Sequence, residues 1–224
     1  ACDNVTVAEG WNLSTAVFLQ SFSVLLQDNQ SIDVYFKPDG LTMYTLGDQN
    51  NSIYQYTLSI AFNVTSAVYL KLFSVTAQDV DPRSIFFNPI GDKMYMCDKI
   101  SEYDLGTPFD IGTASYLQDF SVTSQEIFPF AVYFNPDGDR MFVVGSQNDN
   151  VLQYNLGTPW NVASAVYTQG FSVSSETGVP VGLFFKTNGT KMYIIGSGIS
   201  DDAYQYTLSI AFDVSSAVYD GVSF

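Results

Sequence analysis

The chain alternates between short apolar runs and polar turns, and its apolar residues never recur at helical spacing over three turns. The stretch VYFNPDGDRMFVVGS, residues 132–146, shows the pattern most plainly, because two strand-like runs flank a Pro-Asp-Gly turn. Proline presets φ for such a turn, and glycine accepts a positive φ. The pattern therefore predicts a protein built from β-hairpins, with little or no helix.

The same pattern recurs along the whole chain at intervals of about fifty residues. Three markers keep this rhythm: the glycine that closes the turn, an aromatic residue that precedes a polar residue and a small-residue run, and the tripeptide Phe-Ser-Val. The glycines are Gly40, Gly91, Gly138 and Gly189, the aromatic residues are Trp11, Phe62, Phe109, Trp160 and Phe212, and the tripeptides begin at Phe22, Phe73, Phe120 and Phe171. Three independent markers at one spacing indicate a tandem repeat.

Each repeat divides into four strand-like pieces, A to D. Piece A, for example AVYFNPDG, is nearly all apolar before its turn, as expected of a strand buried on both faces, and piece B, for example RMFVVG, follows it. Piece C, for example NVLQYNLG, and piece D, for example AVYTQGFSV, alternate apolar and polar residues, so we expect piece D near an outer edge. Four antiparallel strands per repeat predict an all-β fold, a β-propeller with four-stranded blades. A β-solenoid is the alternative, which the hairpin turn disfavours.

The order of these pieces resembles the repeat of YVTN-type and NHL-type propellers, and the related repeats of marine bacterial and phage surface proteins. The resemblance rests on NPDG after the first strand, the MYVVG-like second strand, the VLQY-like third strand and FSV, and it covers essentially the whole chain. It implies a propeller fold and carries over no catalytic residue. Lactonase-type propellers rely on metal ligands and a histidine that have no counterpart here.

The pieces do not divide evenly among blades. Pieces A and B occur four times, whereas pieces C and D occur five times, because residues 1–24 hold a C–D pair alone. We expect one propeller domain over residues 1–224, with a half repeat at 1–32 and repeats at 33–84, 85–131, 132–182 and 183–224. Five blade positions with an incomplete first blade are favoured. The alternatives are a four-bladed ring with residues 1–24 packed outside it, and closure by a second chain or by missing sequence, and the unpaired edge of a half blade also favours self-association.

Charge and composition exclude several classes of function. The chain has 8 basic and 23 acidic residues, a net charge of -15, which excludes nucleic-acid partners. No apolar run is long enough to span a bilayer, so membrane insertion is not expected. The chain contains no histidine, which excludes Ser-His-Asp and Cys-His catalysis. We therefore predict a protein that is not an enzyme and has no catalytic residue, and the acidity favours a secreted, cell-surface or virion location.

The sequence gives little evidence for a metal site or a disulfide. Cys2 and Cys97 lie at different repeat positions, so a disulfide between them is possible but not established by the sequence. Acidic clusters offer the oxygen ligands that Ca²⁺ prefers, although none has EF-hand spacing. We predict no cofactor, with a weak candidate for a structural Ca²⁺ at Asp79 and Asp81.

The connections from piece B to C and from piece D to A vary between repeats, and in a propeller both sets emerge on one face. They are rich in Asn, Gln and Asp, which bind sugars from rigid loops, with Phe128 as the best aromatic residue for stacking. Solvated turns are the alternative interpretation, because Asn and Asp tolerate turn geometry. The candidate ligand-binding residues are Gln27, Asp28, Asn29, Asp48, Gln49, Asn50, Gln78, Asp79, Gln125, Glu126, Phe128, Gln147, Asn148, Asp149, Asp201 and Asp202.

These observations predict a non-enzymatic, extracellular or surface-displayed module for binding or assembly. Its partner would be a glycan or a cell-surface protein, bound in a lectin-like or adhesin-like way through the variable loops. One alternative is a structural subunit of a filament, surface layer or virion appendage. Another is a hydrolase or lyase that uses acidic residues at the mouth of the channel.

Overall fold

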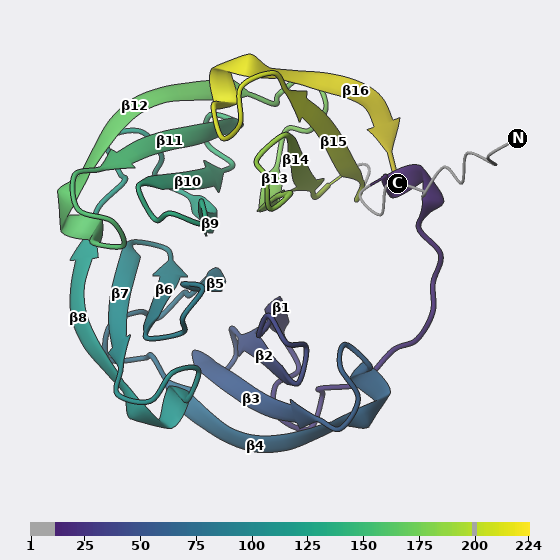
Figure 1. Cartoon of the computed structure of the whole chain (residues 1–224), viewed down its shortest axis with the longest axis vertical. Coiled ribbons are helices and arrows are strands. Elements are labelled where there is room, and N and C mark those ends of the chain that lie inside the picture. Colours follow the sequence, from purple (N-terminus) through teal and green to yellow (C-terminus); the bar gives the residue numbers. More distant parts are fainter. Residues whose placement is uncertain (1–11, 199–200) are drawn as a thin grey trace, which may run out of the picture.

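The computed structural model describes residues 12–198 and 201–224. Within these residues the chain folds into four sheets of four antiparallel strands each, and its helices are five single turns of 3-10 helix. The sheets stand like blades around one axis (Figure 1). The predicted all-β propeller is therefore confirmed, with four complete blades. In the part of the chain described, no helix is long and apolar enough to cross a membrane.

The strands of each blade follow the sequence from the axis outward, so pieces A to D become the first to fourth strands. Blade 1 contains β1 (Ser31–Phe36), β2 (Thr42–Gly47), β3 (Ser52–Leu58) and β4 (Ala67–Ser74), and blade 2 contains β5 (Ser84–Phe87), β6 (Lys93–Cys97), β7 (Ile100–Leu105) and β8 (Ala114–Phe120). Blade 3 contains β9 (Pro129–Phe134), β10 (Arg140–Gly145), β11 (Asn150–Leu156) and β12 (Ala165–Ser172), and blade 4 contains β13 (Pro180–Phe185), β14 (Lys191–Gly196), β15 (Ala203–Leu208) and β16 (Ala217–Ser223).

Four 3-10 helices precede the fourth strands: η2 (Val64–Ser66), η3 (Ile111–Thr113), η4 (Val162–Ser164) and η5 (Val214–Ser216). A fifth, η1 (Leu13–Thr15), precedes residues 16–24. Each begins after an Asn or Asp whose side chain accepts a hydrogen bond from a backbone N–H two residues on, as Asn12 does from Ser14. This local cap explains the polar residue that follows every aromatic marker.

Two of the three repeat markers meet in one contact. Gly138 closes the first hairpin of blade 3 at φ +71°, and a Cβ at this position would lie 2.2 Å from the indole of Trp160. The N–H of Trp160 in turn donates to the carbonyl of Gly138 at 2.9 Å. The same glycine–aromatic contact recurs in the other blades. Glycine is needed here both for its φ and because the ring occupies the space of a side chain.

The hydrophobic core lies in the seams between blades. In the seam between blades 1 and 2, Tyr44 and Leu46 pack against Phe87 and Met94, and the hydroxyl of Tyr44 donates to the carbonyl of Phe109 at 2.5 Å. The other two seams repeat this arrangement with equivalent residues. Each blade thus has two different apolar faces, one for the blade before it and one for the blade after it.

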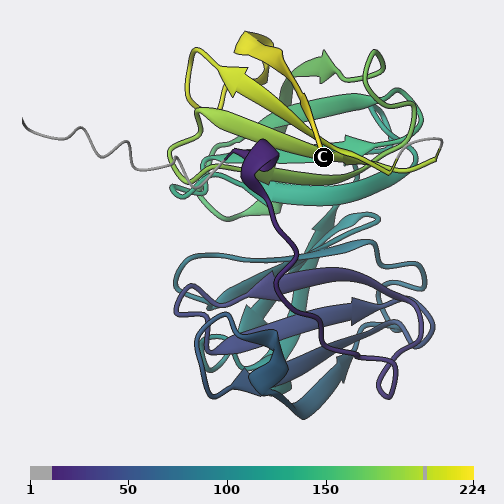
Figure 2. The same cartoon turned by 90° about the vertical axis from the view of Figure 1, so that its right-hand side faces the viewer.

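The ring is open between blades 4 and 1, and the segment that follows η1 spans this opening (Figures 1 and 2). The helix η1, which precedes this segment, contacts blade 4, where the N–H of Leu13 donates to Oε1 of Gln205 at 3.4 Å. Ile111 makes the same contact with Gln55, and Val214 makes it with Gln153. The helix η1 therefore lies on blade 4 as the 3-10 helix of a following blade would.

The other end of this segment contacts blade 1 in the same repeating manner. Phe22 meets Tyr56 edge to face at 5.8 Å, as Phe73 meets Tyr103 at 5.8 Å. Residues 16–24 thus lie where the fourth strand of a fifth blade would lie, but they form no β-strand, because no neighbouring strand pairs with them within the described residues. Residues 1–11, where the sequence predicts the preceding piece C, lie outside the described residues.

Candidate functional site

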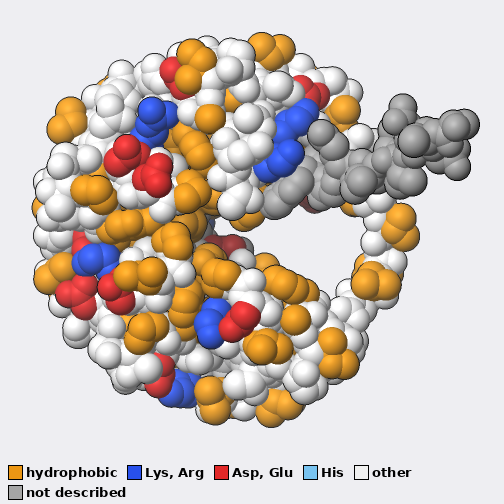
Figure 3. Space-filling model, viewed as in Figure 1, with side chains coloured by type: hydrophobic (Ala, Val, Ile, Leu, Met, Phe, Trp, Pro, Cys, Tyr) orange, Lys and Arg blue, Asp and Glu red, His pale blue; other side chains and the backbone are white. Residues whose placement is uncertain are grey.

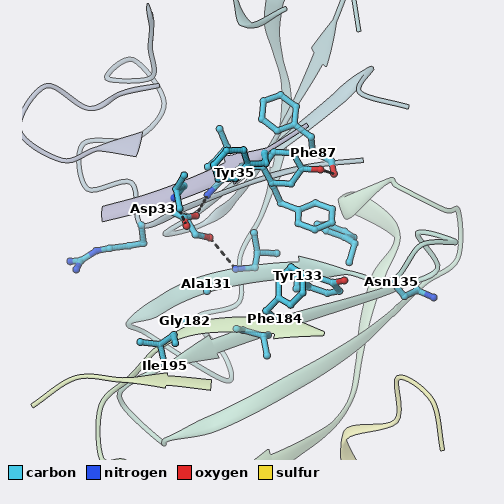
Figure 4. A pocket seen from close by; sticks show the side chains of 18 of the residues that line it. Asp33, Tyr35, Phe87, Ala131, Tyr133, Asn135, Gly182, Phe184 and Ile195 are labelled. Carbon is cyan, nitrogen blue, oxygen red and sulfur yellow. Dashed lines mark hydrogen bonds between the residues drawn. The ribbon is translucent and has the colours of Figure 1, made fainter. Parts of the chain in front are cut away.

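A cavity of about 870 Å³ lies on the axis, walled by the first strands of all four blades (Figure 4). Asp33 and Arg83 line it near the starts of their strands, whereas Asn135 and Pro136 line it at the turn after β9. Figure 3 shows hydrophobic side chains gathered around the hollow at the centre of the molecule. The cavity is therefore a mainly apolar site to which every blade contributes.

Four aromatic side chains, one from each first strand, stand next to one another around this cavity. The rings of Tyr35 and Phe86 lie 6.0 Å apart, those of Phe86 and Tyr133 lie 5.3 Å apart, and those of Tyr133 and Phe184 lie 5.5 Å apart, all edge to face. We call these four residues the aromatic girdle. The next residue along three of these strands, Phe36, Phe87 and Phe134, also lines the cavity.

Hydrogen bonds hold the two tyrosines of the girdle. The hydroxyl of Tyr35 donates to the carbonyl of Phe87, and the hydroxyl of Tyr133 donates to that of Phe185, both at 3.2 Å. Burial raises the pKa of Tyr35 to about 12 and also raises the pKa of Tyr133. Both hydroxyls therefore stay neutral near pH 7.

Asp33 is the one carboxylic acid among the residues that line the cavity in the described part of the chain. Its Oδ2 accepts from the N–H of Ile85 and its Oδ1 from the N–H of Val34, both at 2.8 Å (Figure 4). Burial raises the pKa of Asp33 to about 6, although these two hydrogen bonds lower it. Asp33 therefore changes its charge near neutral pH.

The sequence distinguishes Asp33 from the equivalent residues of the other repeats, although Asp33 is absent from the predicted ligand-binding residues. The equivalent residues are Ser84, Ala131 and Gly182, so a charged residue occurs inside the first strand of only one repeat. Ser84 uses its hydroxyl to accept from the N–H of Val132 at 3.1 Å, which is the contact that Asp33 makes with Ile85. Ser84 is thus the structural counterpart of Asp33. Unlike Ser84, Asp33 adds a titratable group to the cavity wall.

Arg83, the cationic residue of the cavity wall, already interacts with two other side chains. Arg83 forms an ion pair with Asp81, and its guanidinium lies 4.8 Å from the centre of the Phe130 ring. An anionic ligand in the cavity would therefore have to compete with Asp81 for this cation. Because the whole chain is also strongly acidic, the site is better suited to a neutral molecule.

The predicted loop residues lie elsewhere, and in blades 1 and 3 they contact one another. Oδ2 of Asp28 accepts from the N–H and side-chain amide of Asn50 and from the hydroxyl of Tyr54, and Tyr56 donates to Gln27. In blade 3, Glu126 accepts from the backbone N–H groups of Phe128, Gln147 and Asn148, and Asn148 donates to the carbonyl of Gln125. These bonds tie the loop before each first strand to the loop between the second and third strands.

Asp28, Asp79 and Glu126 are buried, while Asn29, Gln49 and Phe128 are exposed. Glycines at the ends of the second strands make room for two of the buried acids, because a Cβ at Gly47 or Gly145 would lie within 2.3 Å of Asp28 or Glu126. None of the predicted loop residues lines the central cavity. Ligand binding through the loop face stays a prediction.

Asp79 and Asp81, the two acidic residues predicted as weak Ca²⁺ ligands, each make other contacts. Asp81 pairs with Arg83, and Oδ1 of Asp79 accepts from the N–H of Asp81 at 2.9 Å. Within the described residues, no group of three acidic or cysteine side chains is arranged to hold a metal ion. Cys97 is buried and free, and burial raises the pKa of its thiol. Cys2, with which the sequence left a disulfide open, lies outside the described residues.

Comparison with solved structures supports the propeller fold, at low sequence identity. The chain is similar to a candidate 6-phosphogluconolactonase from Bacteroides fragilis, with a TM-score of 0.59, 12% identity, and coverage of 87% of this chain and 54% of that one. It is similar to the periplasmic gluconolactonase PpgL of Pseudomonas aeruginosa, with a TM-score of 0.52, 14% identity, and coverage of 85% and 52%. The Cps50 β-propeller domain of Myceliophteria thermophila matches with a TM-score of 0.53, 10% identity, and coverage of 87% and 58%.

The chain therefore belongs to the β-propeller class and spans a little over half the length of these solved chains. No family model and no curated protein sequence matches it. The prediction that this protein is not an enzyme is corrected by the comparison, since proteins of the same fold carry the names of gluconolactonases. The missing histidine excludes particular catalytic groups, and it was wrong to extend that exclusion to catalysis in general.

Proposed function

We propose that the central cavity binds a small, neutral, ring-bearing molecule. The observation that carries this proposal is the aromatic girdle beside the single carboxyl group of Asp33. A volume of about 870 Å³ lies within the range of small-molecule sites, which combine an apolar wall with a few polar groups.

The chemistry of the wall defines the class of ligand. The aromatic rings offer apolar contact to the face of a flat ring, either an aromatic ring or the C–H face of a sugar ring. Asp33 accepts a hydrogen bond when ionised and donates one when protonated, so it fixes the orientation of a hydroxyl or carbonyl group on the ligand. Among the described residues that line the cavity, Arg83 is the one cation, and its ion pair with Asp81 supports a neutral ligand.

Titration with N-phenyl-1-naphthylamine, a neutral aromatic probe whose fluorescence rises in apolar sites, tests this proposal. Phe184→Ser removes one ring of the girdle and should weaken probe binding about tenfold. Leu117→Ser is the matched control, because Leu117 lies on the outer strand β8 and is as exposed as Phe184, 48% against 49%. Equal affinity of the two variants and the unchanged protein would contradict binding in the central cavity.

Lactone hydrolysis is a second candidate, and the raised pKa of Asp33 favours it. A carboxylate with a pKa of about 6 is a competent general base near neutral pH. In this step, Asp33 would take a proton from water as the water oxygen attacks the lactone carbonyl. The ring C–O bond then breaks and the leaving oxygen takes a proton, which yields a hydroxy acid.

A pH-stat assay with glucono-δ-lactone separates this candidate from binding alone. The expected rate exceeds that of an equal concentration of Asp33→Asn and rises with pH through about 6, as Asp33 loses its proton. The variant is the necessary control, because the uncatalysed hydrolysis also rises with pH. If the two proteins give one rate, the cavity is a binding site and not a hydrolase centre for this lactone.

A further inference from the structure

The charged and apolar residues that line the central cavity lie at different ends of it. Asp33 and Arg83 are the charged residues among the described residues that line the cavity, and both lie near the starts of the first strands. At the other end, the turns after the first strands contribute four residues that we call the proline mouth: Pro38, Pro89, Pro136 and Thr187. The cavity wall therefore changes from polar to apolar along the axis.

The cavity is also longer than a single aromatic ring. On blade 1 it is lined from Ile32 to Phe36, which are four residue steps or about 13 Å of extended strand, and Pro38 lies beyond the end of this strand. Asp33 and Asn135, which lies in the turn after β9, stand far apart on opposite sides of Figure 4. A ring that packs on the girdle, with ring centres about 4.5–7 Å apart, therefore leaves space toward the proline mouth.

The end of the cavity at the proline mouth offers mainly apolar contacts. Phe62 and Trp160 line this end, because their rings lie against the glycines of the turns after β1 and β9. The polar atoms of Asn135 are engaged within its own turn, since Nδ2 donates to Asp139 at 2.6 Å and Oδ1 accepts from the N–H of Arg140 at 2.9 Å. A polar group of a ligand is therefore favoured at the other end.

Asp33 can bind such a polar group. Each of its carboxylate oxygens accepts one hydrogen bond, from the N–H of Val34 or of Ile85. An oxygen of an ionised carboxylate has a second lone pair, so it can accept a further bond from a hydroxyl group of a ligand. Tyr35 of the girdle lies two residues, or about 7 Å, farther along the strand. A hydroxyl group carried directly on the ligand's ring therefore reaches Asp33 while the ring packs on the girdle.

We propose that the ligand of the central cavity is an elongated amphiphile, with a ring in the girdle, a hydroxyl group toward Asp33 and an apolar chain that extends to the proline mouth. This inference rests on the proposed binding of a neutral, ring-bearing molecule, and it adds the length and the polarity of that molecule. The chain loses contact with water at the proline mouth, so it contributes affinity that a bare ring lacks.

Isothermal titration calorimetry of the unchanged full chain with 4-methylphenol, 4-butylphenol and 4-hexylphenol tests this inference. These probes share one ring and one hydroxyl group and differ in chain length alone. At pH 8 they are neutral, because a phenol titrates near pH 10 like the tyrosine side chain, whereas Asp33 is ionised. Because each buried methylene raises affinity about fourfold, we expect 4-butylphenol to bind at least about tenfold more tightly than 4-methylphenol.

Two variants of blade 4 test which end of the cavity receives the chain. Thr187→Trp narrows the proline mouth and should weaken binding of 4-hexylphenol at least about tenfold, while 4-methylphenol binds as before. Val181→Trp narrows the end with Asp33 and should weaken binding of both phenols by the same factor. Ile32→Trp, at that same end, replaces it if the Val181 variant does not fold. Thr107→Trp is the control, because Thr107 is exposed like Thr187 and does not line the cavity.

The possible results separate this inference from the proposed function. If 4-methylphenol binds and longer chains bring no gain, the inference fails alone. It also fails if Thr187→Trp weakens short and long phenols equally, if the loss that depends on chain length occurs in Val181→Trp instead, or if Thr107→Trp behaves like Thr187→Trp. If neither the phenols nor N-phenyl-1-naphthylamine binds, the proposed function fails with it.

Discussion

The backbone N–H of Leu13 donates to Oε1 of Gln205 at 3.4 Å, although 192 residues separate them in the sequence. The contact repeats the bonds of Ile111 with Gln55 and of Val214 with Gln153, which join neighbouring blades. The N-terminal segment thus connects the last blade to the first by the interaction that links successive blades. Among the described residues, this connection alone links blades 4 and 1 along the circumference, because no sheet lies between them.

Gln205→Leu tests this connection. The substitution removes the acceptor for Leu13, so we expect faster amide exchange at residues 13–24 and a loss of about 1 kcal/mol or less in the free energy of unfolding. Gln55→Leu is the matched control in a closed seam, where the N–H of Ile111 is buried and would lose its partner. It should cost more, about 1–3 kcal/mol. Equal losses, measured by urea unfolding, would show that burial in the closed seam does not strengthen this contact.

Gly138→Ala should destabilise the protein by about 3 kcal/mol or more. The new Cβ would overlap the Trp160 indole, and a φ of +71° is costly for alanine. Gly178→Ala is the control, because no atom lies within 4 Å of a Cβ there, and it should leave the free energy of unfolding nearly unchanged. Thermal unfolding followed by circular dichroism compares the two. Similar melting temperatures would show that the aromatic ring moves aside freely.

Glu102 is a fully buried carboxylate at a position where the other blades have Gln55, Gln153 and Gln205. It accepts from Lys93 at 2.5 Å, from Gln118 at 2.7 Å and from the N–H of Val162 at 3.1 Å. Glu102→Gln keeps the bond to Val162, and Lys93 keeps its ion pair with Asp104, so we expect a loss of at most about 1 kcal/mol.

Glu102→Ala should cost about 3 kcal/mol or more, because it leaves buried donors without a partner. Urea unfolding of both variants near pH 7 gives the comparison. A glutamine variant as unstable as the alanine variant would show that the ion pair with Lys93, and not the hydrogen bond to Val162, holds this seam.

Asp33 makes stability depend on pH in a defined direction. Its pKa of about 6 in the folded protein lies above the value of 3.8 expected in the unfolded chain, so the folded state holds the proton more tightly. The stability that this proton contributes is present below about pH 4 and is lost as the pH rises to about 6. Asp33→Asn should therefore lose less stability than the unchanged protein between pH 4 and pH 7. Parallel curves from urea unfolding across this range would contradict the raised pKa.

The sequence predicts the blades well because the bonds within a blade are local. Strands that follow one another in the chain pair with one another, so turn residues such as Gly138 and the alternation in 150–156 fix the hairpins and the order of strands. The repeat rhythm then identifies the propeller. The contact between Gly138 and Trp160, which joins two of the markers, was not predicted, since each marker was interpreted by itself.

The candidate site was not predicted, because it exists only when four blades meet. Tyr35 and Phe36 both line the cavity, and no repeat by itself shows that its first strand lies at the axis. The variable loops drew attention to Asp28 and Glu126, whose side chains are buried against their own blades.

The sequence by itself determined the repeat, the four strands of each blade and the turns between them, because these depend on backbone bonds between neighbouring segments. Only the tertiary structure decided that Asp33 lines a central cavity and which seam faces are exposed. The physical reason is that the angle between blades depends on how side chains from two repeats fill a seam, and that packing is not encoded in either repeat alone.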